Sequence, residues 1–160
     1  MFAIDTNLLV YAHNTASPFN HFAKTFLGQV MNTRNADGQL DICFPVQVFL
    51  EFIHIITWER LKTPLSLTQA LQIVHEYVDT GVTILIPPAT YIHTFLELCQ
   101  SVTTRKKVFD VAIAATLKDY RIRGLYTANP DDFKQFAFLE VINPLKNTVA
   151  PDTAIEVVQQ

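Results

Sequence analysis

Apolar residues recur along the chain with two spacings, one typical of strands and one typical of helices. Short runs that predict strands lie at 1–4, 40–44, 82–88, 124–129 and 139–145. Helical spacing covers 6–11, 17–34, 45–60, 63–81, 89–102 and 108–124, and a turn with a short helix is expected at 130–136. This alternation predicts an α/β domain with a mainly parallel central sheet that is flanked by helices.

Local capping chemistry predicts where two of these helices begin. Ser17 precedes Pro18, and proline is favoured at the first helical position, so we expect a helix to start there. Ser66 is expected to cap the helix that ends near Gly81. Both starts are inferred from neighbouring residues alone.

The length and the apolar content indicate a single domain. The chain has 160 residues, of which 49% are hydrophobic, which is enough for one core and too little for two comfortable ones. We expect residues 1–145 to form this domain and residues 146–160 to form a polar C-terminal tail.

Several features favour a cytoplasmic protein over a secreted or membrane protein. The most apolar stretch, 42–58, contains a proline and several polar residues, so it does not predict a membrane span. The N-terminus lacks the pattern of a secretory signal. Cys43 and Cys99 lie apart in mostly apolar surroundings, as expected for reduced thiols in a core.

Two acidic residues lie in helical segments that are otherwise apolar. Glu51 is the only formal charge within 46–58, and no Lys or Arg lies three or four positions from it. A buried carboxylate of this kind is costly unless it is protonated or meets a cation from elsewhere. Asp110 lies in a similar stretch, although Lys106 and Lys107 are at helical spacing and an ion pair with them is the alternative.

Polar residues also follow two of the expected strands. Asp5, Thr6 and Asn7 follow the first strand, and the residues after the strand at 124–129 include Asp131 and Asp132. Ligands gather beyond the carboxyl ends of parallel strands, which favours a binding site. Helix capping by Asp5 and ordinary turn chemistry in the Asn-Pro-Asp-Asp segment are the alternatives.

One α/β sheet could bring these acids to a common edge. Carboxylates without His or Cys suit a hard cation such as Mg²⁺ or Mn²⁺, which prefers oxygen ligands. Such an ion can activate water and stabilise charge during phosphodiester hydrolysis. The acids that we expect to converge are Asp5, Glu51, Asp110 and Asp132.

Four short motifs occur in an order that resembles a known family. They are AIDTNLLVYA at the N-terminus, FLEF around Glu51, DVAIAATL after Asp110 and TANPDDF near the end of the domain. With these motifs the chain resembles the PIN-domain family, and in particular the VapC-type toxins of prokaryotic toxin–antitoxin pairs, over nearly its whole length. DVAIAATL matches the family's Asp-x-x-Ile-Ala-Ala pattern less literally, and Asn129 stands where Asp is frequent.

The resemblance implies a Mg²⁺-dependent ribonuclease with a Rossmann-like fold, commonly dimeric and held inactive by a small antitoxin protein. It implies that Asp5 and Asp110 are direct metal ligands, that Glu51 binds metal or orients the attacking water, and that Asp132 completes the acidic pocket. Supporting roles fall to Thr6, Asn7, Thr127 and Asn129. The alternative is a catalytically inactive PIN-fold protein that binds RNA or serves as a scaffold.

The charge balance limits how such a protein could bind RNA. A formal net charge of -3 disfavours nonspecific coating of nucleic acid, which draws on clustered Lys and Arg. We expect Arg105, Lys106 and Lys107, just before Asp110, to contact RNA phosphates, and a second basic group lies at 118–123. A solvated helix face is the alternative for both groups.

Overall fold

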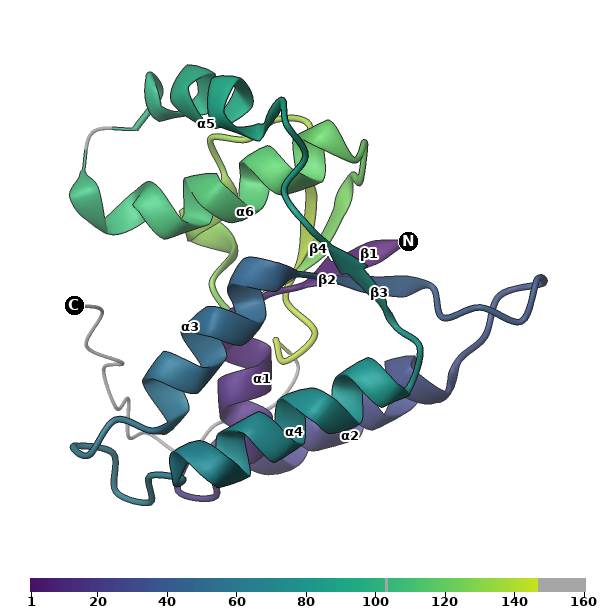
Figure 1. Cartoon of the computed structure of the whole chain (residues 1–160), viewed down its shortest axis with the longest axis vertical. Coiled ribbons are helices and arrows are strands. Elements are labelled where there is room, and N and C mark those ends of the chain that lie inside the picture. Colours follow the sequence, from purple (N-terminus) through teal and green to yellow (C-terminus); the bar gives the residue numbers. More distant parts are fainter. Residues whose placement is uncertain (103, 147–160) are drawn as a thin grey trace.

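The computed structural model describes residues 1–102 and 104–146, which form a parallel sheet flanked by helices (Figure 1). The strands lie in the order β3-β2-β1-β4-β5, and each neighbouring pair is parallel. The predicted α/β class is therefore confirmed. The strands are β1 (Phe2–Ile4), β2 (Ile42–Pro45), β3 (Thr83–Leu85), β4 (Gly124–Tyr126) and β5 (Glu140–Ile142).

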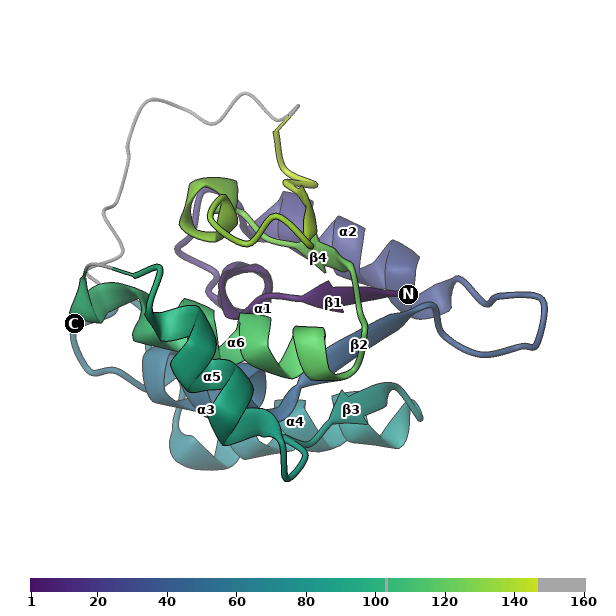
Figure 2. The ribbon, with the colours of Figure 1, turned by 90° about the horizontal axis from the view of Figure 1, so that it is seen from above.

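Helices cover the sheet on both sides. Figure 2 shows α2 on one side of the sheet, and α5 and α6 on the other. The helices are α1 (Thr6–His13), α2 (Asn20–Asn32), α3 (Val46–Ile56), α4 (Leu67–Asp79), α5 (Tyr91–Cys99) and α6 (Val108–Asp119). Two short 3₁₀ turns, η1 (Arg105–Lys107) and η2 (Pro130–Phe133), precede α6 and follow β4.

The direction of the strand order changes beside β1. The chain proceeds from β1 to β2 and β3 on one side, and then crosses to β4 and β5 on the other. The loops after β1 and β4 therefore leave the same edge of the sheet at the switch point, which is where ligands bind in folds of this kind. Gly124 makes the pairing of β4 with β1 possible, because a Cβ at this position would collide with the Phe2 ring.

One predicted helix start is confirmed and one is wrong. Ser66 caps α4 in a capping box with Gln69, and the chain leaves this helix through Gly81, whose φ is +74°. The helix expected from Ser17 begins instead at Asn20. The Asn20 amide donates hydrogen bonds to two carbonyls at the end of α1, so a contact with the preceding helix determines this start.

Two further expectations concern the ends of the domain and the membrane. None of the helices in the described ranges is long and apolar enough to cross a bilayer. The expected polar tail lies outside the described residues apart from Lys146, and the domain boundary at residue 145 stays a prediction.

Candidate active site

Asp5 lies where β1 ends and α1 begins, and its carboxylate is buried. Oδ1 accepts a hydrogen bond from the Thr6 backbone N–H at 2.7 Å, which caps α1. Oδ2 accepts from the Asn7 amide at 2.8 Å and from the Thr127 hydroxyl at 2.6 Å. Asp5 therefore caps the helix and also reaches the loop after β4, so its local role does not exclude a chemical one.

Asn7 joins the two loops at the switch point. Its Oδ1 accepts from the Ala128 backbone N–H at 3.0 Å, and its Nδ2 lies 3.1 Å from Thr127 Oγ1. Thr127 Oγ1 also accepts from the Asn129 backbone N–H at 3.0 Å. These contacts hold the loop after β4 against Asp5, so the first acid has a fixed orientation.

Glu51 projects from the middle of α3 towards the start of α1. Its Oε2 accepts a hydrogen bond from the Thr6 hydroxyl at 3.2 Å. Its Oε1 is buried and has no hydrogen-bond partner within 1–102 and 104–146. Burial, together with the charge of Asp5, raises the pKa of Glu51 to about 7, against the opposing effect of the Thr6 hydrogen bond.

Asp110 lies in the first turn of α6 and is half-buried. Burial raises its pKa to about 7, and the charges of Asp132, Asp5 and Glu51 act in the same direction. The charge of Lys107 lowers the pKa of Asp110, but its effect is the weakest of those that act on this acid. Among the described residues, no ion pair joins Asp110 to Lys106 or Lys107, so the structural alternative for this acid is not realised.

The four acids are therefore neighbours in the electrostatic sense. Burial raises the pKa of Asp5 to about 6 despite its three hydrogen bonds, and the charge of Asp132 contributes to this rise. Asp132 acts on both Asp5 and Asp110, which places η2 near these two acids. Within the described ranges, however, no three His, Cys, Asp or Glu side chains are already grouped closely enough to hold one metal ion.

Comparison with known proteins identifies the fold and its relatives. No family model matches the chain. The chain is 25% identical over 147 residues to Ribonuclease VapC24 of Mycobacterium tuberculosis, a match that covers 91% of this chain and 97% of the relative. The chain has the fold of PIN domains and is similar in sequence to a VapC-type ribonuclease.

Solved structures agree with this assignment at the level of the fold. A toxin–antitoxin complex from Klebsiella pneumoniae superimposes with a TM-score of 0.61 at 17% identity, covering 90% of this chain and 98% of that one. VapC20 from Mycobacterium tuberculosis, described as a sarcin-ricin loop cleaving toxin, gives a TM-score of 0.63 at 12% identity, with coverage of 85% and 95%. VapBC2 from Rickettsia felis, bound to a promoter DNA fragment, gives 0.59 at 18% identity, with coverage of 89% and 97%.

The acids of this PIN domain fit a hard divalent cation. The available ligands are carboxylate oxygens, which Mg²⁺ and Mn²⁺ prefer. The unpartnered Glu51 Oε1 supplies a buried acceptor that a cation could satisfy. Mutual repulsion also raises the pKa values of Asp5, Glu51 and Asp110, and a positive ion would relieve it.

The residues predicted for supporting and RNA-binding roles divide into two groups. Thr6, Asn7 and Thr127 hydrogen-bond to the acids, whereas Asn129 contributes a backbone N–H and its side chain is exposed. The basic run 105–107 forms η1, in which Arg105 and Lys106 are exposed and Lys107 is half-buried.

Sequence reasoning missed a contact between the two helices that carry Glu51 and Asp110. Gln47 Nε2 donates to Thr116 Oγ1 at 2.8 Å, and Thr116 is fully buried. Gln47 lies one helical turn before Glu51, so this hydrogen bond joins α3 to α6 next to the acids. A polar residue four positions before Glu51 in an apolar helix was the available signal.

Proposed function

We propose that this PIN domain is a divalent-metal-dependent ribonuclease, with Mg²⁺ or Mn²⁺ as cofactor, that hydrolyses RNA phosphodiester bonds. The observation that supports the proposal is that burial and the charges of neighbouring acids raise the pKa values of Asp5, Glu51 and Asp110. Several interacting acids with perturbed pKa values, near the carboxyl ends of parallel strands, favour chemistry. Similarity to Ribonuclease VapC24 supports RNA as the substrate.

The proposal gives each acid a role. Asp5 and Asp110 bind the cation, and Asp132 completes the negative pocket from η2. When bound, such an ion stabilises negative charge on a phosphodiester and activates water. Glu51 Oε1 has no hydrogen-bond partner among the described residues and accepts a proton from the attacking water.

The hydroxyl and amide groups around the acids fix their orientation. Thr6 holds Glu51 Oε2, so that Oε1 is the atom left for the reaction. Thr127 and Asn7 hold Asp5 Oδ2 from two sides. Asn129 stands where an acid is frequent, so the pocket carries less negative charge than it would with Asp. A less negative pocket binds fewer metal ions tightly before substrate is present.

The proposal also extends to the partners. We take the protein to be the toxin of a toxin–antitoxin pair, inhibited by a small antitoxin protein, homodimeric and active in the cytoplasm. The match to a toxin–antitoxin complex from Klebsiella pneumoniae supports the antitoxin. Copurification of a tagged chain with the product of the neighbouring small reading frame, followed by light scattering, tests both the antitoxin and the dimer.

A cleavage assay tests the enzymatic proposal. The purified chain is incubated with single-stranded and hairpin RNAs in EDTA, Mg²⁺ or Mn²⁺, beside the Asp110→Asn variant. We expect discrete cleavage that requires the metal and is lost in the variant. Metal-independent RNA binding without cleavage would instead favour the inactive RNA-binding or scaffold protein.

A further inference from the structure

A groove of about 320 Å³ lies against η2, the 3₁₀ turn that carries Asp132. Its lining includes Asp131 and Lys134 from the η2 region, and Lys146 near the end of the described chain. The adjacent residue, Asp132, interacts electrostatically with Asp5 and Asp110. One short turn therefore separates the acidic site from a groove with two lysines.

The lysines around this groove come from separate parts of the sequence. Lys134 Nζ lies 2.6 Å from Asp131 Oδ1 in an ion pair whose side chains are both largely exposed. Among the residues that line the groove, Lys134 and Lys146 are the cations and Asp131 is the acid. Positive charge therefore exceeds negative charge on this side of η2, in contrast to the acidic side.

The rest of the groove is apolar. Leu139 and Val141 are half-buried, and Phe136 is almost fully buried in its floor. An apolar floor with cationic edges suits a single nucleic-acid strand, because bases can lie on the floor while phosphates meet the lysines. A compact anion would gain nothing from the apolar surface.

We propose that this groove, named here the Lys134–Lys146 groove, holds the RNA strand adjacent to the phosphate that is cleaved. The inference rests on the proposed ribonuclease function. Four acids repel a phosphate backbone, so cations must lie close to them if a strand is to enter. Lys134 follows the turn that carries Asp132, and Lys146 lines the same groove.

Charge reversal tests the groove. A fluorescein-labelled single-stranded RNA is titrated with full-length protein in the Asp110→Asn background, in EDTA, across a series of salt concentrations. The test variant is Lys134→Glu/Lys146→Glu, and the matched control is Arg34→Glu/Lys62→Glu, which makes the same charge change at exposed positions elsewhere. Neutral Lys134→Ala/Lys146→Ala avoids new repulsion with Asp131, and thermal melts verify that each variant is folded.

We expect the test variant to bind RNA about tenfold more weakly or worse and to lose roughly 1.4 from the salt slope, the value for two contacts to single-stranded phosphates. The control should lose much less affinity. In the cleavage-competent protein, Lys134→Ala/Lys146→Ala should raise KM and leave kcat nearly unchanged.

Three outcomes would overturn the inference. One is that RNA affinity depends equally steeply on salt concentration in the test and control variants, when the wild type is able to cleave RNA. Another is an unchanged KM in the neutral variant. The third concerns a labelled poly-glutamate peptide, titrated in the same way as the RNA. If the lysine substitutions weaken binding of this peptide but not of RNA, the groove is a polypeptide site. Absence of cleavage by the wild type itself would count against the proposed function, while the binding titration would still decide whether the groove holds RNA.

Discussion

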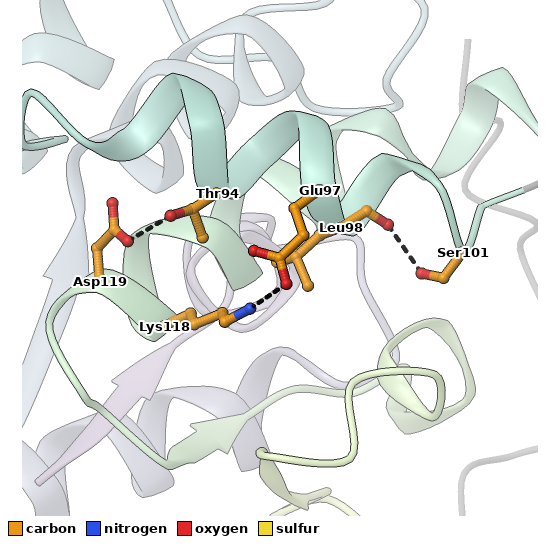
Figure 3. Close-up of polar contacts among 6 residues, drawn as sticks. All are labelled: Thr94, Glu97, Leu98, Ser101, Lys118 and Asp119. Carbon is orange, nitrogen blue, oxygen red and sulfur yellow. Dashed lines mark hydrogen bonds and ion pairs between the residues drawn. The ribbon is translucent and has the colours of Figure 1, made fainter.

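Helix α6 carries an aspartate at each end, and the two have opposite environments. Asp119 in the last turn accepts hydrogen bonds from Thr90 at 3.0 Å and from Thr94 at 2.6 Å, one on each carboxylate oxygen. Figure 3 shows the Thr94 contact beside the Lys118–Glu97 ion pair, which together attach α5 to α6. Asp110 in the first turn instead faces three other acids, and its pKa rises to about 7.

Both carboxylates are half-buried, so burial alone does not distinguish them. A negative charge is disfavoured at a helix C-terminus, and the two threonines compensate for this at Asp119. A negative charge is favoured at a helix N-terminus, yet at Asp110 burial and the neighbouring acids together outweigh that benefit. Asp119 therefore stabilises the packing of α5 on α6, whereas the acids around Asp110 indicate a site for a cation.

Replacing each aspartate by asparagine should separate these roles most clearly. Asp110→Asn should lower the cleavage rate by about 10³-fold or more, because a catalytic group is lost. At pH 8 without metal the same change should raise Tm, since it removes repulsion. Asp119→Asn should cost about 1 kcal/mol of unfolding free energy and retain cleavage. Cleavage kinetics and thermal melts measure both, and equal losses of activity would remove the distinction.

Metal and pH should change the stability of the fold through the acidic site. The folded chain keeps protons on Asp5, Glu51 and Asp110 up to pH 6–7, whereas the unfolded chain releases them near the ordinary values of 3.8 and 4.5. The folded state then binds more protons, so stability without metal falls as pH rises from about 4 to 7 and levels off above.

At pH 8, Mg²⁺ at 100 times its Kd should restore about 2.7 kcal/mol. Urea denaturation from pH 4 to 9, with EDTA or with Mg²⁺, provides the measurement. Asp110→Asn should flatten the pH profile and weaken the response to Mg²⁺, whereas Asp119→Asn should keep both. If the stability of the wild type depends on neither pH nor Mg²⁺, the result would contradict a shared cation site.

Removing a hydrogen-bond donor from the buried Asp5 should lower the free energy of unfolding more than removing one from the half-buried Asp119. Thr127→Val takes away the hydroxyl at 2.6 Å from Asp5 and should lower unfolding free energy by about 1–3 kcal/mol. Thr94→Val takes away the equivalent donor to Asp119 and should cost about 0.5–1.5 kcal/mol. Serine at either position should recover most of the loss in denaturation experiments, and failure of serine to do so would implicate packing instead.

The smallest expected effect concerns the hydrogen bond between α3 and α6. Thr116→Val removes the partner of Gln47 and should lower kcat by about tenfold, because small displacements of reacting groups are costly. Thr94→Val breaks a comparable contact between α5 and α6 and should leave kcat unchanged. Steady-state kinetics with Thr116→Ser as the rescue variant tests this, and matching kcat values for the two valine variants would argue against a role for the α3–α6 contact.

Local patterns were sufficient to predict much of this molecule. The spacing of apolar residues predicts the parallel α/β sheet, since periodicity reflects which face of each element is buried. Glu51 could be singled out because a lone carboxylate in an apolar helix conflicts with that periodicity. Ser66 predicts a helix start because its capping partners lie within three residues.

Other features depend on residues that meet only in the folded chain. Asp5 receives its shortest hydrogen bond from Thr127, 122 residues away, and Asn20 rather than Ser17 begins α2 because it meets the end of α1. The sequence suggested Arg105, Lys106 and Lys107 as RNA contacts, whereas the fold brings Lys134 and Lys146 to one groove. Burial and Coulomb interactions act through space between distant segments, so the raised pKa values and the cationic groove were decided by tertiary structure alone.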